Sequence, residues 1–147
     1  MLAEQNRLKR SVDFKQARAG ARAARPSVVV HCVDKRERAS QPVLIGFVVS
    51  KAVGNAVTRN RVKRRMRAVM MDWLTSTDQV LTGKLIVVRA LPALASAPFD
   101  HLHTDVIGAV TTAVRRCNAQ AGQGQAVKQA QAVKPRVAAG QAEVVHV

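Results

Sequence analysis

Six basic side chains crowd into the nine residues from Arg59 to Arg67, within the stretch VGNAVTRNRVKRRMR that spans 53–67. No acidic residue occurs between Arg38 and Met71, so no acid nearby in the sequence offsets this charge. Like charges four residues apart on a helix repel by about 0.2–0.5 kcal/mol per pair. A merely solvated helix face usually mixes charges of both signs. We therefore favour a surface that binds phosphate groups.

The residue types in this stretch suit recognition of nucleic acid. An arginine guanidinium is a planar fork that matches phosphate oxygens. Asn60 is a poor helix former between two arginines, and its amide both donates and accepts, which suits a base edge or a ribose. The predicted RNA-binding residues are Arg59, Asn60, Arg61, Lys63, Arg64, Arg65 and Arg67.

The charge of the whole chain points the same way. Its 147 residues hold 24 Lys and Arg against nine Asp and Glu, a net charge of +15. Such an excess repels itself in the compact state, and a polyanionic partner relieves the repulsion. Nucleic acid is the leading candidate, and an anionic membrane surface is a weaker one.

No residue cluster in the sequence predicts a catalytic or metal site held by the protein. His101 and His103 are two apart and point in different directions on a helix. His31 and Cys32 would project from opposite faces of a strand. The motifs GxGxxG, GxSxG and HExxH and the Walker loop are all missing from the sequence. The protein is therefore not predicted to be an enzyme by itself.

The cysteines and the N-terminus predict a cytoplasmic protein. Cys32 and Cys117 are the two cysteines, too few for a disulfide framework, and a reducing compartment is the simplest setting. The first ten residues, MLAEQNRLKR, contain no apolar stretch typical of a signal peptide. No apolar run approaches the length that crosses a bilayer, so no membrane association is expected.

The elements before the basic stretch read as a helix and strands. Ser11 is the expected N-cap of a short helix that Gly20 ends, and a basic connector with a short edge strand follows. Residues 27–33 and 43–50 are apolar and β-branched, so both are predicted strands. The second is apolar on both faces and is predicted to be central. The two strands are expected to form an antiparallel hairpin.

The basic stretch itself lies on a predicted helix from Asn55 or Thr58 to about Leu74. Its apolar stripe is Val62, Met66, Val69 and Trp73. A strand over 84–89 and an amphipathic helix over 100–117 follow. The order helix, strands, helix, strand, helix predicts an α+β fold, a small α-β sandwich, over residues 1–117. Residues 118–147 are rich in Ala, Gln and Gly and are predicted to be a disordered or loosely helical tail.

With these elements in place, VGNAVTRNRVKRRMR closely resembles the signature of the protein subunit of bacterial ribonuclease P. That signature has an apolar residue and an alanine before Arg-Asn-Arg, then an apolar residue, Lys-Arg and further basic residues. NRLKRSVDFKQ from Asn6 resembles the family's opening, and GFVVSKAVGNAV from Gly46 resembles its strand and turn before the basic helix. The likeness covers roughly residues 6–117.

The resemblance implies a fold, a reaction and partners. The βαβ crossover would be of the rare left-handed kind. A large catalytic RNA would cut precursor tRNA hydrolytically, leaving a 5′ phosphate on the mature tRNA. Magnesium ions would be held mainly by that RNA. The protein would be a non-catalytic accessory subunit, a monomer in the holoenzyme, whose basic helix docks on the catalytic RNA.

The resemblance also implies a cleft for the single-stranded 5′ leader, between the first helix and the sheet. Its residues would be Phe14, Arg18, His31, Ser50 and Lys51. Arg18 stands where many relatives carry a second aromatic residue, and His31 where a tyrosine is common. The cleft is therefore expected to hold the leader more by charge than by stacking. Phe14 has an alternative role in ordinary core packing.

Two other classes of protein share these features. A ribosomal or rRNA-binding protein has the same charge and a similar small α+β fold, and only the signature argues against it. A DNA-binding helix-turn-helix protein would need two closely spaced helices around the basic one, whereas strands precede it here. A tRNA-processing assay with added catalytic RNA separates the first of these alternatives from the ribonuclease P hypothesis.

Overall fold

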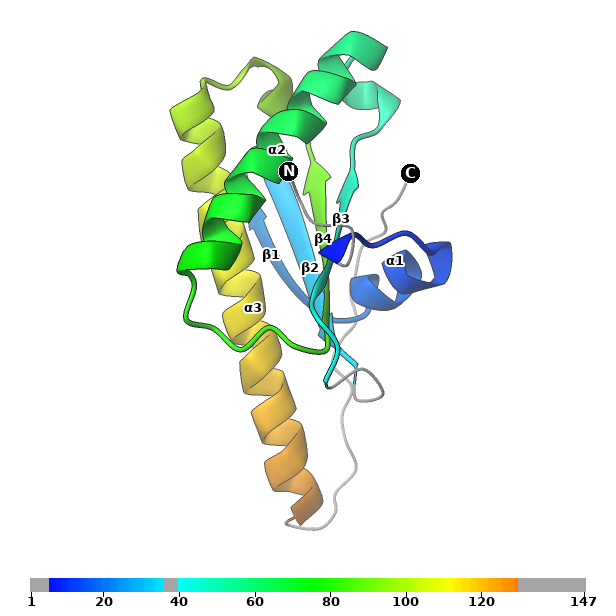
Figure 1. Cartoon of the computed structure of the whole chain (residues 1–147), viewed down its shortest axis with the longest axis vertical. Helices are drawn as coiled ribbons and strands as arrows, with labels where there is room; N and C mark the ends of the chain where they lie inside the picture. The colour runs from blue at the N-terminus through cyan, green and yellow to red at the C-terminus, as the bar shows by residue number, and fades with distance from the viewer. Residues whose placement is uncertain (1–5, 36–39, 130–147) are drawn as a thin grey trace.

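The computed structural model describes residues 6–35 and 40–129, which form three α-helices, four strands and two short 3₁₀ helices (Figure 1). In chain order these are α1 (Ser11–Arg18), β1 (Ala21–Arg25), β2 (Val28–Asp34), β3 (Leu44–Val48), η3 (Lys51–Val53), α2 (Ala56–Ser76), β4 (Lys84–Ala90), η4 (Pro92–Ser96) and α3 (Phe99–Gln129). The α+β class predicted from the sequence is confirmed.

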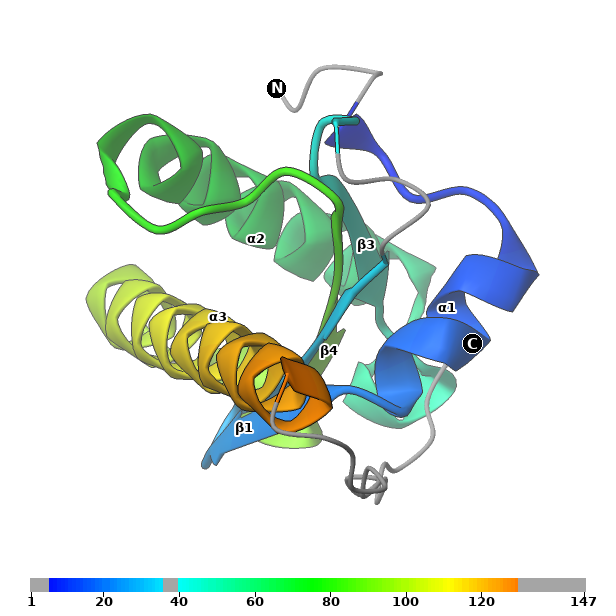
Figure 2. The ribbon, with the colours of Figure 1, turned by 90° about the horizontal axis from the view of Figure 1, so that it is seen from below.

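The four strands form one sheet in the order β1-β2-β4-β3. Strand β2 is antiparallel to both of its neighbours, β1 and β4, and β3 runs parallel to β4. Helix α1 covers one face of the sheet, and α2 and α3 cover the other (Figure 2). Each face has its own cluster of buried apolar side chains, a large one beneath α2 and α3 and a small one beneath α1. The predicted α-β sandwich is therefore confirmed.

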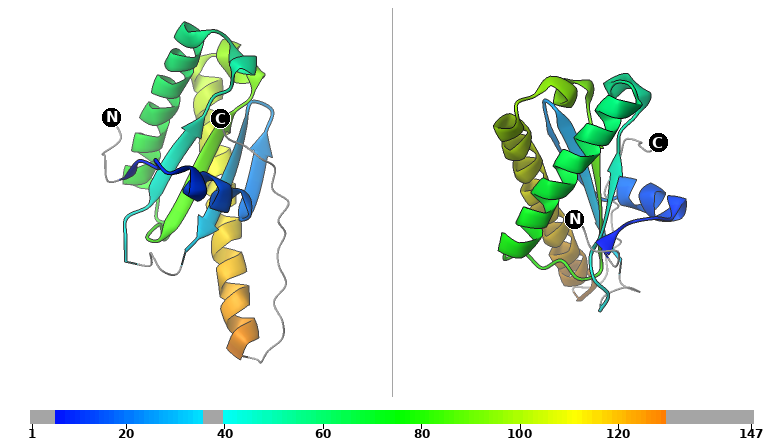
Figure 3. Two further views of the ribbon diagram at one scale, coloured as in Figure 1. Left: turned by 90° about the vertical axis from the view of Figure 1, so that its right-hand side faces the viewer. Right: turned by 45° about the horizontal axis from the view of Figure 1, so that its top comes forward.

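The connection from β3 through α2 to β4 is a left-handed crossover, as the resemblance implied. Seen with α2 in front of the sheet and both arrows pointing upward, β4 lies to the left of β3 (Figure 1). The view from the α1 side agrees, because α2 is then behind the sheet and β4 lies to the right of β3 (Figure 3). Nearly all parallel βαβ connections have the opposite hand.

The predicted place of β3 was wrong. It is neither central nor paired with β2, because β4 lies between the two strands. Strand β3 is apolar on both faces because helices cover both: Val48 belongs to the cluster beneath α1 and Ile45 to the cluster beneath α2 and α3. Part of its outer edge is covered by the N-terminal segment, where the Leu8 amide donates to the Ile45 carbonyl at 2.9 Å.

Helix α2 begins and packs as its sequence predicts. The Asn55 side chain accepts a hydrogen bond from the Thr58 amide at 2.9 Å, which caps the first turn. The predicted apolar stripe of α2 is buried. The cap predicted for α1 was wrong: Arg10 occupies the N-cap position without a side-chain hydrogen bond, and Ser11 is the first helical residue.

Helix α3 is longer than predicted. Its stripe of Leu102, Val106, Val110 and Val114 is fully buried against the sheet. The helix then continues beyond Cys117 to Gln129. Residues 118–129 thus belong to α3, so the helix extends into the segment predicted to be a disordered or loosely helical tail. Residues 130–147 lie outside the described residues, so the prediction for them stays a prediction.

The two cysteines meet inside the larger core. Cys32 on β2 and Cys117 on α3 are both buried free thiols. The hydrogen bond to Cys117, together with burial, holds the pKa of the Cys32 thiol well above its ordinary value. Close by, Lys84 is buried and pairs with Asp34 at 3.1 Å. These contacts join α3 and β4 to β2.

Candidate nucleic-acid interface

Helix α2 distributes its basic side chains over three directions. With 3.6 residues per turn, Lys63 and Arg67 lie on one flank of the buried stripe, and Arg61 and Arg65 lie on the other. Arg64 points away from the sheet and is exposed. The basic stretch is therefore not one uniform face.

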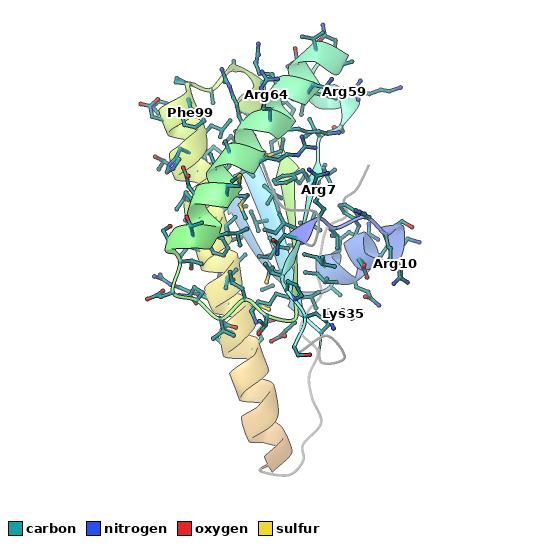
Figure 4. The ribbon with its side chains drawn as sticks, in the orientation of Figure 1. Arg7, Arg10, Lys35, Arg59, Arg64 and Phe99 are labelled. Atoms are coloured by element: carbon teal, nitrogen blue, oxygen red, sulfur yellow. The ribbon has the colours of Figure 1, made fainter. Side chains whose placement is uncertain are left out.

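Two arginines of α2 are held by backbone carbonyls. The Arg61 guanidinium donates to the carbonyl of Ala95 on η4 at 3.3 Å, which joins α2 to the segment before α3. The Arg59 side chain donates to the carbonyl of Gly54 at 3.1 Å. Figure 4 shows Arg59 and Arg64 on the half of α2 nearest η3, and Phe99 at the start of α3. These contacts fix the arginines without neutralising them.

The charge of α2 stays uncompensated within the described part of the chain. There, none of its six bases, from Arg59 to Arg67, forms an ion pair. A cationic surface with no acid in contact attracts polyanions from a distance and binds their phosphates on arrival. This is the electrostatic pattern that the sequence predicted.

A groove lies at the outer edge of β3, next to the Lys63 flank of α2. It consists of two adjoining hollows of about 250 and 280 Å³. Four residues line both: Lys9, Phe14, Phe47 and Lys63. Arg7 and Arg67 line the first hollow, and no acidic residue lines either. The groove therefore combines aromatic rings with cations.

The two aromatic residues of the groove come from opposite layers of the sandwich. Phe14 on α1 packs against the small cluster on the α1 face, and Phe47 on β3 packs against the large cluster on the other face. Both are half-buried, so part of each ring borders the groove. Phe14 approaches β3 closely because Gly46 has no side chain: a Cβ there would lie 2.6 Å from the Phe14 ring.

The structure separates the predicted cleft residues. Phe14 lines the groove. Arg18, half-buried, lies one turn further along α1, and the half-buried Ser50 and exposed Lys51 follow β3, outside the two hollows. The Ser50 hydroxyl accepts from the Ala52 amide at 3.3 Å.

His31, predicted for the cleft, lies outside the two hollows. His31 is fully buried in the sheet, on the α1 face beside Val87, so it does not reach the groove. Alternation put His31 and Cys32 on opposite faces of β2, but it did not show that the face carrying His31 is covered there.

Several basic and aromatic residues of the site escaped the sequence reading. Arg7, Lys9 and Phe47 line the groove. The half-buried Arg89 of β4 lies outside the two hollows, on the α1 face of the sheet, where it pairs with Val29 and Val48. The alternation in KLIVVRA predicts that face for Arg89. No local pattern predicted that Phe47 and the N-terminal bases meet.

The described residues offer no protein-held metal site and no membrane span. In residues 6–35 and 40–129, no three His, Cys, Asp or Glu side chains gather as ligands for an ion. His103 instead packs its ring against Phe99, with centroids 6.1 Å apart. Over the same residues no helix combines the length and apolar character that crossing a bilayer requires.

Comparison with known sequences connects this geometry to a family. A family model described as Ribonuclease P matches residues 2–114. The ribonuclease P protein component of Kocuria rhizophila is 48% identical over 118 residues, covering 80% of this chain and 99% of the relative. That of Streptomyces bikiniensis is 44% identical over 117 residues, covering 75% and 93%.

Comparison with solved structures agrees. The RNase P protein of Staphylococcus aureus superposes with a TM-score of 0.62 at 26% identity, covering 74% of this chain and 94% of that one. The RNase P protein of Thermotoga maritima has a TM-score of 0.56 at 21% identity, covering 69% and 92%, a likeness of fold alone.

Proposed function

The chain belongs to the ribonuclease P protein family, and on that premise we propose that it binds the catalytic RNA of ribonuclease P and the 5′ leader of precursor tRNA. It thereby assists the endonucleolytic removal of the leader, which gives the mature 5′ end of tRNA. The observation that carries this proposal is the uncompensated basic surface of α2 beside a groove of aromatic rings and cations.

The basic helix is the proposed contact with the catalytic RNA. Arg64 is exposed, and Arg59 donates to a backbone carbonyl through Nε and Arg61 through one Nη, so the other Nη groups are the proposed phosphate donors. Asn60 is exposed between them and supplies an amide for a base edge or a ribose. Contacts of this kind release counterions from the RNA, so they make the affinity strongly dependent on salt.

The reaction itself is assigned to the RNA. Hydrolysis of one phosphodiester bond leaves the 5′ phosphate on the mature tRNA, and magnesium ions held mainly by the RNA supply the Lewis-acid chemistry. The protein's part is to add positive charge where two polyanions meet, which replaces part of the ion atmosphere. We place the protein in the cytoplasm, as a monomer within the holoenzyme.

Reconstitution tests the proposal. The purified protein is mixed with a bacterial ribonuclease P RNA and precursor tRNA over a range of magnesium concentrations. We expect no cleavage by the RNA-free protein, and cleavage by the RNA at lower magnesium when the protein is present. Site-specific cleavage by the RNA-free protein, or an unchanged magnesium requirement, would contradict the proposal.

A further inference from the structure

We propose that Phe47, Lys63 and Arg67 bind the single-stranded leader of precursor tRNA, so that helix α2 serves two RNAs at once. The flank with Lys63 and Arg67 faces the substrate, and the rest of the basic stretch faces the catalytic RNA. This inference rests on the proposed function and assigns to the substrate two bases that the sequence placed on the catalytic RNA.

The groove is positioned to connect the α1 side of the sheet with helix α2. Its floor is the outer edge of β3 from Ile45 to Val48, together with Val49, the residue that follows the strand. One wall is the N-terminal segment and Phe14, on the α1 side of the sheet, and the other is Lys63 and Arg67 of α2. A strand that occupies the groove thus passes from α1, around the sheet edge, to α2.

The side chains that line the groove suit unpaired nucleic acid. Unpaired nucleic acid is bound by aromatic rings on which bases stack and by cations that follow the backbone. Phe14 and Phe47 supply two rings, and Arg7, Lys9, Lys63 and Arg67 supply four cations. Arg18 stands one turn after Phe14, so α1 offers a single ring at the groove. Phe47 supplies the second ring from β3.

The shape of the surface decides between the two RNAs. The hollows are concave and of nucleotide size, and their aromatic rings are half-buried, which suits splayed single-stranded bases better than a duplex. Arg64 lies on the convex, exposed side of α2, where the phosphates of a folded RNA have access. Lys63 and Arg67 at the groove are therefore separated by position from Arg64 on the outer side of α2.

The test compares three groove variants with two matched controls. The groove variants are Phe47→Leu, Lys63→Ala and Arg67→Ala. The controls are Phe99→Leu, an exposed ring at the start of α3 outside the groove, and Arg64→Ala, a base on the outer side of α2. Each protein is assayed for its affinity to the catalytic RNA alone. Each reconstituted holoenzyme is then assayed with leader-bearing and leaderless tRNA, and melting temperatures check folding.

We expect the groove variants to lose affinity only for tRNA that carries a leader. Loss of a stacking ring in Phe47→Leu should weaken leader-bearing tRNA roughly 5- to 150-fold. Lys63→Ala and Arg67→Ala should each flatten the salt dependence of leader binding by about 0.7 in log–log slope. Affinity for the catalytic RNA should stay within twofold of the unchanged protein for all three, and Phe99→Leu should change neither affinity.

The inference is overturned if Lys63→Ala and Arg67→Ala weaken the catalytic RNA as Arg64→Ala does, or if Phe47→Leu weakens leader-bearing and leaderless tRNA equally. It is also overturned if Phe47→Leu leaves both affinities unchanged while folding is intact. The proposed function is judged by a separate result: if Arg64→Ala leaves catalytic-RNA affinity and its salt dependence unchanged, the assignment of α2 to that RNA fails, whichever way the leader assay comes out.

Discussion

The two edges of the sheet use basic side chains in different ways. At the β1 edge, Arg116 donates to the Arg22 carbonyl at 2.7 Å, and Arg25 donates to the Ala24 carbonyl at 3.2 Å and approaches Thr112 at 3.5 Å. At the β3 edge, Lys63 and Arg67 line an open groove with aromatic rings. At the β1 edge the arginines contact the protein's own backbone. At the β3 edge the basic side chains line a hollow.

The difference shows that charge alone does not define a binding surface. An open strand edge is a template for unwanted pairing, and arginines that occupy its carbonyls protect it. The guanidinium of Arg25 lies so close to Gly108 that a Cβ there would be 3.1 Å from it, so this side chain is packed against α3. We therefore expect substitutions at the β1 edge to change stability, and substitutions at the β3 edge to change RNA binding.

The largest expected loss of stability comes from a substitution just before β1. In Gly20→Ala, the new Cβ would overlap the backbone carbonyl of Cys32, which has no room to move inside the sheet. We expect a loss of about 3 kcal/mol in the free energy of unfolding, measured by urea denaturation.

Gly46→Ala is the matched control at the β3 edge, because its new Cβ meets the movable ring of Phe14 instead. It should cost about 1 kcal/mol. Equal losses for the two variants would contradict the idea that the first obstacle is rigid and the second is not.

Next in size is Phe14→Ala at the groove. The ring is half-buried against the α1-side cluster, so its removal should cost about 2 kcal/mol of stability, less than the loss of a fully buried phenylalanine. Because the ring packs over Gly46, Phe14 combines the predicted place at the leader with the core packing that was its alternative role.

The binding role of Phe14 is read from the holoenzyme. Affinity for leader-bearing tRNA should fall by about 1–3 kcal/mol, while affinity for leaderless tRNA should not change. If the Phe14→Ala holoenzyme loses the same affinity for leader-bearing and leaderless tRNA, Phe14 is a core residue and not a leader contact.

Smaller effects are expected when one arginine from each of the two edge regions is replaced by alanine. Arg116→Ala removes a charge-assisted hydrogen bond to β1 and should cost about 1 kcal/mol of stability, with no change in the salt dependence of binding to the catalytic RNA. Arg64→Ala should have the opposite pattern. Its free energy of unfolding should stay within about 0.5 kcal/mol of the unchanged protein, and the log–log salt slope of binding to the catalytic RNA should fall by about one. Thermal melts and binding at several salt concentrations separate the two, and a changed slope for Arg116→Ala would make the β1 edge a binding surface as well.

The smallest expected effect is that of truncation after Gln120. The buried stripe of α3 ends near Cys117, and the composition beyond it does not support a packed core. Melting temperature and precursor cleavage should both stay unchanged. A loss of either would assign a structural or functional role to the C-terminal segment, including the last turns of α3.

The local elements and the charge follow from residues that are close together in the chain. The Asn55 cap and the apolar stripe from Val62 to Trp73 predicted α2, and spacing alone placed the bases off that stripe. Cap chemistry and periodicity depend on residues within one or two turns, so a single sequence carries them. The basic motif also carried the family resemblance, which the comparisons confirmed.

The way in which the elements meet depends on long-range packing that local patterns do not contain. Alternation along β3 reports that both its faces are covered, but not by what, so it did not distinguish a central strand from an edge strand between two helices. For the same reason, His31 had the predicted face and yet is buried. The groove joins Lys9, Phe47 and Lys63 from three segments far apart in the chain. Such a juxtaposition follows from strand order and layer packing, which no local pattern encodes.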